Sequence, residues 1–151
     1  GTVNAPGVIG LGVAAARARA EQAARAARTA ALRDRLWDGI ASKVPRARRN
    51  GAPDALLPNT LNVEFEGVAA DVLVEALDGE GVAASAGAAC ASGAARPSPA
   101  LLAMGRSAAQ ARAAVRFSLG AGNDEAQIDR VLALLPDLVA RVRAAGASGA
   151  R

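Results

Sequence analysis

The sequence predicts an α/β fold, an α+β sandwich in which a small mixed, mainly antiparallel sheet packs against helices and one long helix begins the chain. Three observations predict it. Residues 8–44 are rich in alanine and arginine and contain no proline, as a long helix requires. Residues 60–67 and 113–120 alternate apolar with polar side chains, the period of a half-buried strand. Residues 124–143 carry an apolar stripe at helical spacing.

The length of 151 residues suits one domain with a real core. We expect a linking helix at about 8–44 and a sheet domain at about 58–145, so that 1–145 form one domain and 146–151 a disordered tail. Hydrophobic residues make up 52% of the chain and aromatic residues only 2%, so the core must be built from aliphatic side chains. No apolar run reaches the roughly 20 residues of a membrane helix, and no membrane partner is expected.

The first half of the chain gives three elements in order. The long helix places Leu32, Leu36, Trp37, Ile40 and Val44 on one face and ends at Pro45. A loop rich in Asn, Gly and Pro follows, and then the strand with Leu61, Val63 and Phe65 on its buried side. A short helix over 69–79 ends at glycines.

The second half continues with a short apolar strand over 81–85 and a loop of small residues. Ser98 is expected to cap a short helix, and a second short helix is expected at about 108–111. The strand over 113–120 comes next. Asp124 and Gln127 then form a capping pair at the start of the last helix.

Charge and composition exclude several classes of protein. The net charge of +4 and the pI of about 10.9 suggest a nucleic-acid partner, but acidic residues interleave with the arginines and no aromatic residues are placed for base stacking. We therefore expect no nucleic-acid partner. One cysteine and no histidine exclude an internal disulfide, a zinc site and a Cys-His or Ser-His-Asp arrangement made from this chain alone. A reducing, cytoplasmic location is expected.

Two residues are candidates for chemistry. Cys90 lies among small residues in the stretch VAASAGAACASGAARPS; it is either a small buried hydrophobe or a reactive thiol on a segment with little to hold it still. Arg116 lies on the face of its predicted strand opposite Val115 and Phe117. It is either a solvated strand residue or a guanidinium that binds a carboxylate with two hydrogen bonds.

Seven segments carry a family resemblance, in this order: GTVNAPGVIGLG, LRDRLWDGI, LPNTLNVEFEGV, ALDGEGVAASAGAACASG, PSPALLAMG, VRFSLG and DEAQIDRVLALLPDLVARVR. Together they resemble the C-terminal part of a cysteine desulfurase, of the class V aminotransferase superfamily, over residues 1 to about 143. The resemblance implies the small C-terminal domain of a fold-type I enzyme that depends on pyridoxal 5'-phosphate (PLP).

The resemblance also implies a function and three site residues. Such enzymes are homodimers that convert L-cysteine to L-alanine and pass the sulfur to an acceptor protein, such as an iron–sulfur cluster scaffold. By motif, Cys90 would carry the sulfur as a persulfide and Arg116 would bind the substrate carboxylate. Thr2 would reach the PLP phosphate of the neighbouring subunit.

This sequence departs from the family pattern at several positions. Ala86 and Ala88 replace serines of the cysteine loop, and Pro99 stands where a histidine is common. Lys43, the only lysine, does not match the motif of the lysine that binds PLP. The resemblance therefore implies that the N-terminal PLP-lysine domain is absent and that the chain alone is inactive, as the product of a truncated, split or incomplete gene.

Two other functions stay open. The chain could be a fragment of a selenocysteine lyase-like carbon–sulfur lyase. It could also be a non-catalytic module for dimerisation or for binding a sulfur acceptor, in which case its partner would bind equally well after Cys90→Ala.

Overall fold

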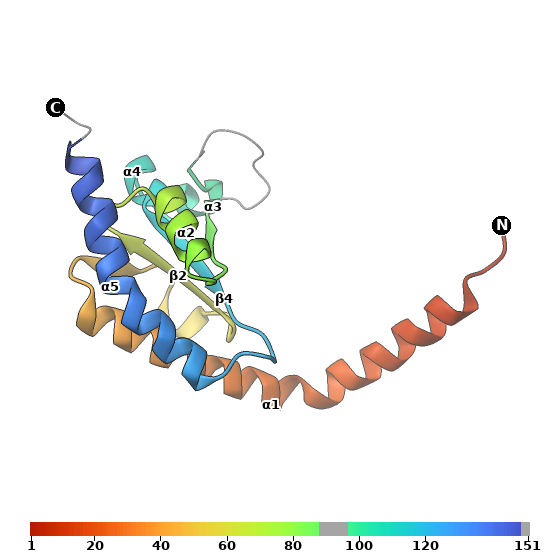
Figure 1. Ribbon diagram of the computed structural model, residues 1–151. Coiled ribbons are helices and arrows are strands. Elements are labelled where there is room, and N and C mark those ends of the chain that lie inside the picture. Colours follow the sequence, from red (N-terminus) through yellow and green to blue (C-terminus); the bar gives the residue numbers. More distant parts are fainter. Residues whose placement is uncertain (88–96, 149–151) are drawn as a thin grey trace.

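The computed structural model describes residues 1–87 and 97–148 and contains a four-stranded sheet (Figure 1). The strand order is β1-β2-β4-β3, and each neighbouring pair is antiparallel. The strands are β1 (Ala47–Arg49), β2 (Thr60–Phe65), β3 (Ser85–Ala86) and β4 (Ala114–Ser118). The predicted α/β class is confirmed, and over the described ranges the sheet is antiparallel throughout rather than mixed.

The helices follow the predicted order. They are α1 (Ala5–Lys43), α2 (Ala70–Gly79), α3 (Pro99–Ala103), α4 (Ala108–Arg112) and α5 (Glu125–Ser148), with a 3-10 turn at Pro53–Ala55. Among the residues described, none of these helices combines the length and the apolar character needed to cross a bilayer.

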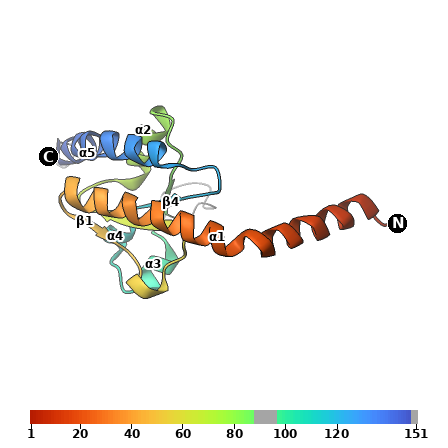
Figure 2. The ribbon, with the colours of Figure 1, turned by 90° about the horizontal axis from the view of Figure 1, so that it is seen from below.

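The helices form two unequal layers on the sheet (Figure 2). The second half of α1 packs with α2 and α5 against one face, and their side chains join those of β2 and β4 in one buried cluster. The short helices α3 and α4 contribute to a separate small cluster on the other face, made of Leu101, Ala111 and Ala114. One face of the sheet is therefore fully covered and the other only in part.

Strand alternation decides which residues reach each face, because successive side chains point to opposite sides. Val63 and Val115 are register partners and are fully buried in the main core. Asn62 and Arg116, one residue earlier and later, are also register partners and lie on the opposite, partly covered face. The predicted placement of Arg116 opposite Val115 and Phe117 is confirmed.

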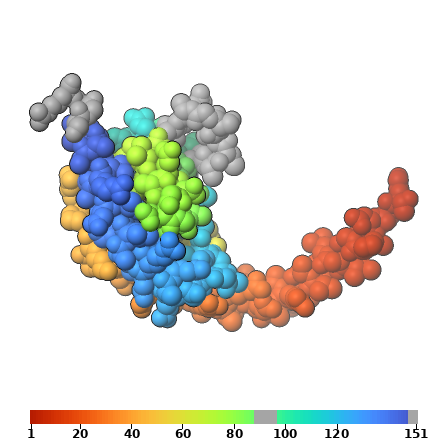
Figure 3. Space-filling view, in the orientation of Figure 1, coloured from red at the N-terminus to blue at the C-terminus, as the bar shows by residue number. Residues whose placement is uncertain are grey.

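Helix α1 divides into two parts. Its first half projects away from the sheet and is exposed on all sides (Figures 1 and 3), including the apolar residues Val8, Ile9, Leu11 and Val13. Its second half buries Leu32, Leu36 and Ile40, as the apolar spacing predicted. Only this second half is anchored by packing.

The boundaries differ from the predictions at three places. The apolar segment predicted as a strand over 81–85 pairs with β4 only through Ser85 and Ala86. Strand β1 was not predicted; it pairs with the edge of β2 through Ala47 and Phe65. Helix α5 continues to Ser148, past the predicted start of the tail, since nothing between 143 and 148 is a helix breaker apart from the tolerated Gly146.

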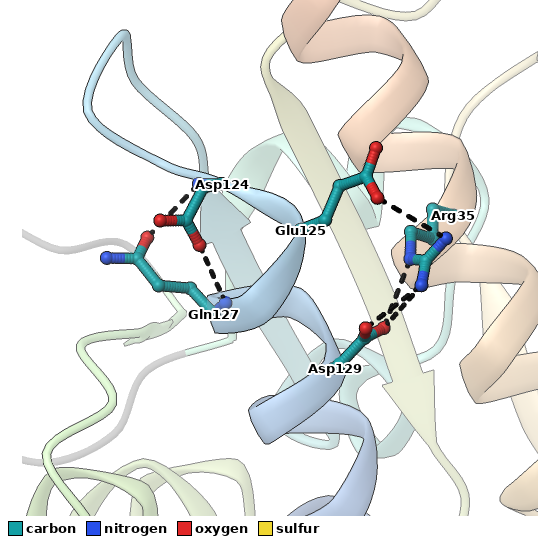
Figure 4. A network of polar contacts seen from close by, with 5 residues as sticks. All are labelled: Arg35, Asp124, Glu125, Gln127 and Asp129. Carbon is teal, nitrogen blue, oxygen red and sulfur yellow. Dashed lines mark hydrogen bonds and ion pairs between the residues drawn. The ribbon is translucent and has the colours of Figure 1, made fainter.

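Polar side chains fasten α5 to α1 (Figure 4). Arg35 of α1 donates two hydrogen bonds to Oδ1 of Asp129, from Nε at 3.1 Å and from Nη2 at 2.8 Å, and lies 3.9 Å from Glu125. The hydrogen bond and charge of Asp129 raise the pKa of the Arg35 guanidinium. Because these groups are exposed, their ion pairs add little to the free energy of unfolding. Their main effect is to set the register of α5 against α1.

The capping pair at the start of α5 is formed as predicted. Oδ1 of Asp124 accepts a hydrogen bond from the Gln127 backbone N–H at 2.9 Å, and Gln127 Oε1 accepts one in return from the Asp124 N–H at 3.4 Å (Figure 4). Asp124→Ala is expected to lower the free energy of unfolding by about 1 kcal/mol, because it leaves a helix-end donor unpaired. Thermal or urea unfolding followed by circular dichroism measures this.

The matched control is Asp137→Ala, which removes an exposed carboxylate from the middle of the same helix. Alanine has the higher helix propensity, so this variant should be at least as stable as the parent. Equal stabilities of the two variants would contradict the assigned role of the cap.

Candidate functional site

A row of polar side chains crosses the partly covered face of the sheet. Arg116 of β4 is the register partner of Asn62 on β2 and also of Ser85 on β3. Side chains of register partners on adjacent strands lie on the same face and close together. We call Asn62, Arg116 and Ser85 the polar row; Arg116 is its centre.

Arg116 is half-buried, and its guanidinium is held from one side only. Nη2 donates a hydrogen bond to Ser85 Oγ at 3.3 Å. The Nε donor is buried and has no hydrogen-bond partner. Within the described residues no carboxylate lies within ion-pair distance of this guanidinium. Among the described residues, the hydrogen-bonding capacity of this cation is therefore largely unused.

Asn62 is fixed by a second asparagine. Asn50 lies just beyond β1, where its backbone N–H donates to the Asn62 carbonyl at 2.9 Å. Its side-chain Nδ2 donates to Asn62 Oδ1 at 2.7 Å. Asn50 is only 4% exposed, and its own Oδ1 is buried without a partner. The Asn62 amide is thus oriented by a residue that water hardly reaches.

An acid on the same face, Glu64, has an ion-pair partner other than Arg116, although its Oε2 is buried without a hydrogen bond among the described residues. Glu64 lies two residues along β2, under the end of the sheet that α3 and α4 cover, and is 2% exposed. Its Oε2 lies 3.9 Å from Arg106 Nη1. At the other end of β4, Ser118 is exposed. The polar row therefore lies where the sheet passes from covered to open, and Glu64 does not neutralise Arg116.

This arrangement suits a small anion. A guanidinium without an acidic partner binds planar oxyanions with two parallel hydrogen bonds. Partial burial weakens the screening by water and strengthens such bonds. Arg116 can therefore hold a carboxylate at a defined place and orientation on the rigid sheet.

The predicted site residues are not all brought together. Arg116 lies in the polar row. Thr2 is exposed and precedes α1, which begins at Ala5; Figure 1 shows this end of the chain away from the sheet. Cys90 lies outside the described residues; in the chain it follows Ser85 by five positions. The sequence analysis missed Asn62, Asn50 and Ser85 as site residues, although the alternation along 60–67 already placed Asn62 on the polar face.

The fold matches that of a known group of solved structures. A chain described as a NifS-like protein superposes on 93% of this chain with a TM-score of 0.78, at 28% sequence identity, and the match covers 35% of that chain. A NifS-like protein from Rickettsia africae gives a TM-score of 0.76 over 91% of this chain and 35% of its own, at 21% identity. The sheet and its helices thus have the fold of these NifS-like chains.

The sequence comparison is more specific. Residues 1–131 match the family described as aminotransferase class-V, and the chain belongs to this family. The cysteine desulfurase of Gluconacetobacter diazotrophicus is 42% identical over 95% of this chain, and that of Cereibacter sphaeroides 45% over 99%. The chain spans 36% and 38% of the length of these two relatives.

Proposed function

We propose that this chain acts as the C-terminal part of a cysteine desulfurase, which converts L-cysteine to L-alanine and carries the released sulfur as a persulfide on Cys90. The observation that carries the proposal is the half-buried guanidinium of Arg116 on the open part of the sheet, which has no acidic partner among the described residues. It is a ready site for the α-carboxylate of an amino acid. The desulfurases to which the chain is similar support the choice of L-cysteine.

The position of Cys90 along the chain is compatible with this role. Ser85 contacts Arg116, and Cys90 comes five residues later. Five residues of peptide span at most about 18 Å, so the thiol is tethered near the proposed carboxylate site. As a thiolate it would attack the substrate sulfur; the new S–S bond forms as the carbon–sulfur bond breaks, and the product after proton uptake is L-alanine.

The chain does not carry the covalent anchor of the cofactor. PLP, when bound, supplies the electron sink that weakens the bonds at the substrate α-carbon. The only lysine, Lys43, is exposed at the end of α1, on a different element from the polar row. The residues present therefore fit the substrate carboxylate rather than the PLP ring, and we propose that Thr2 contacts the cofactor phosphate held by a neighbouring subunit. The chain alone is then inactive.

The remaining parts of the proposal concern the setting of the reaction. The working protein is a homodimer in the cytoplasm. It delivers the persulfide sulfur to an acceptor protein, such as an iron–sulfur cluster scaffold. The desulfurases similar to this chain motivate these assignments.

The direct experiment uses what we call the assembled enzyme, in which this chain replaces the corresponding part of the Gluconacetobacter desulfurase and PLP is added. With L-cysteine, mass spectrometry of the peptide that contains Cys90 should detect a persulfide, and L-alanine should form. Cys90→Ala should abolish the persulfide and turnover. A parent enzyme that forms no persulfide on this peptide, or turnover that survives Cys90→Ala, would overturn the proposal.

A further inference from the structure

We infer that the Asn62 amide is a second ligand of the substrate carboxylate beside Arg116, and that Asn50 is the positioning residue that turns this amide toward it. The inference rests on the proposed function, in which Arg116 binds the carboxylate. It adds a specificity-determining residue from a different strand.

The first step concerns the direction of the Asn62 amide. Its Oδ1 accepts the hydrogen bond from Asn50 Nδ2 at 2.7 Å. Asn50 extends β1, which pairs with β2 on the side away from β4. The carbonyl end of the Asn62 amide therefore faces β1. Because the oxygen and nitrogen of an amide point apart, the NH2 end is left for the β4 side, where the register partner Arg116 lies.

The second step is that these two neighbours do not satisfy each other among the described residues. The guanidinium has donors and no acceptor, and the NH2 group of Asn62 is also a donor. The Asn62 Oδ1 can accept a second hydrogen bond, but it is turned toward Asn50, and no hydrogen bond joins it to Arg116 among the described residues. A group that bonds both must bring acceptor oxygens, and a carboxylate brings two.

Ser85 completes the set from the other side. Its Oγ accepts the hydrogen bond from Arg116 Nη2, so its own hydroxyl hydrogen points elsewhere and is free to donate. The polar row thus offers three kinds of donor, an amide, a guanidinium and a hydroxyl, on three adjacent strands. This pattern fits a negatively charged carboxylate better than a neutral group, because no acid among the described residues forms an ion pair with Arg116, and Glu64 lies within ion-pair distance of Arg106 instead.

Asn50 explains why the amide keeps this orientation. It is 4% exposed and is held by its backbone bond to Asn62. A buried asparagine with an unpartnered oxygen carries a desolvation cost. The hydrogen bond from Asn50 to Asn62 satisfies the NH2 group, which is the other polar end of the Asn50 side-chain amide.

The experiment compares two replacements of Asn62 in the assembled enzyme, threonine and valine, which are isosteric with each other. Asn62→Thr keeps a donor on the strand, whereas Asn62→Val removes it; both residues favour strands. Losing one hydrogen bond to a charged ligand corresponds to about a tenfold loss of affinity. We expect Asn62→Val to raise KM for L-cysteine about tenfold with kcat within about twofold, and Asn62→Thr to recover most of this loss. The dissociation constant of L-alanine, measured by calorimetry, should change in parallel.

The control for a general effect on β2 is Thr60→Val, two residues away on the same face. It makes the change from threonine to valine that also separates the two variants at position 62, and its KM should match the parent. Equal KM values for Asn62→Val, Asn62→Thr and the parent would overturn the inference. If Asn62→Val does not fold, Asn62→Asp retains the acceptor for Asn50 and places a negative charge where the NH2 was. An unchanged KM for that variant would overturn the inference equally.

Arg116→Ala separates this inference from the proposed function. If Arg116→Ala raises KM and Asn62→Val does not, only the role of Asn62 fails. If Arg116→Ala leaves KM and L-alanine binding unchanged, the carboxylate site itself fails, and the assignment of Asn62 fails with it.

Discussion

Arg116→Lys is expected to raise KM for L-cysteine in the assembled enzyme about a hundredfold. Lysine keeps the positive charge but loses the planar fork that makes two parallel hydrogen bonds with a carboxylate. It also cannot donate to Ser85 and hold a carboxylate with the same geometry as the guanidinium, whose Nη2 bonds Ser85 Oγ at 3.3 Å. Two weakened charge-assisted hydrogen bonds correspond to about two powers of ten in affinity. Steady-state kinetics measures the change.

The matched control is Arg48→Lys. Arg48 lies on β1 on the same face of the sheet, as the register partner of Glu64, but is exposed and 3.8 Å from Glu66. The same chemical change there should leave KM at the parent value. A comparable rise in KM for both variants would show that the effect follows from exchanging any arginine on this face for lysine and is not specific to the site.

Stability supplies a second measurement on the same variant. The Arg116 Nε is buried without a partner, and an unsatisfied buried donor costs free energy. Arg116→Lys removes this donor, so the thermal midpoint should not fall although substrate binding fails. Binding sites are where chains retain groups that cost stability. A large fall in the midpoint would instead assign Arg116 a structural role.

The sequence allowed the sheet face of Arg116 to be predicted because alternation is a local property. Val115 and Phe117 flank it and are buried, so the position of the guanidinium follows from three consecutive residues. The helices with clear apolar spacing were predicted for the same reason. Packing on one face and a cap at one end are both encoded within a few turns of the chain.

Strand β1 could not be predicted in this way. Its three residues, Ala47–Arg49, show no apolar alternation. The strand exists because β2 has an open edge, and because Arg46, at φ 58°, turns the chain back along that edge after Pro45. The guanidinium of Arg49 also lies over the ring of Trp37 on α1, with its central carbon 5.4 Å from the ring centroid. All these causes lie in the tertiary structure.

The polar row could not be predicted from the sequence for the same reason. Asn62 and Arg116 are 54 residues apart in the chain and meet only through the register of β2 and β4. Asn50 reaches Asn62 through an extension of a strand that was itself not predicted. The alternation along its strand and the family resemblance made Arg116 a candidate. The partners that orient and complete its site depend on how four strands align.

Leu36→Ala is expected to lower the free energy of unfolding by about 3 kcal/mol. Leu36 is 1% exposed and belongs to the core cluster through which α1 packs on the sheet and α5. Removing a buried leucine side chain loses its transfer free energy and leaves a cavity that neighbours fill only in part. A domain of this size has a total stability of about 5–15 kcal/mol. Urea unfolding measures the loss.

The same helix provides the control, since Leu11 is 71% exposed on the part of α1 that projects from the sheet. Leu11→Ala removes the same atoms from water-accessible surface and should leave the free energy of unfolding almost unchanged. The contrast tests whether α1 is anchored only by its second half. If the two substitutions destabilise the chain equally, the projecting half is also packed in solution. The covered face of the sheet, opposite the polar row, would then depend on more of α1 than the residues from Thr29 to Ile40.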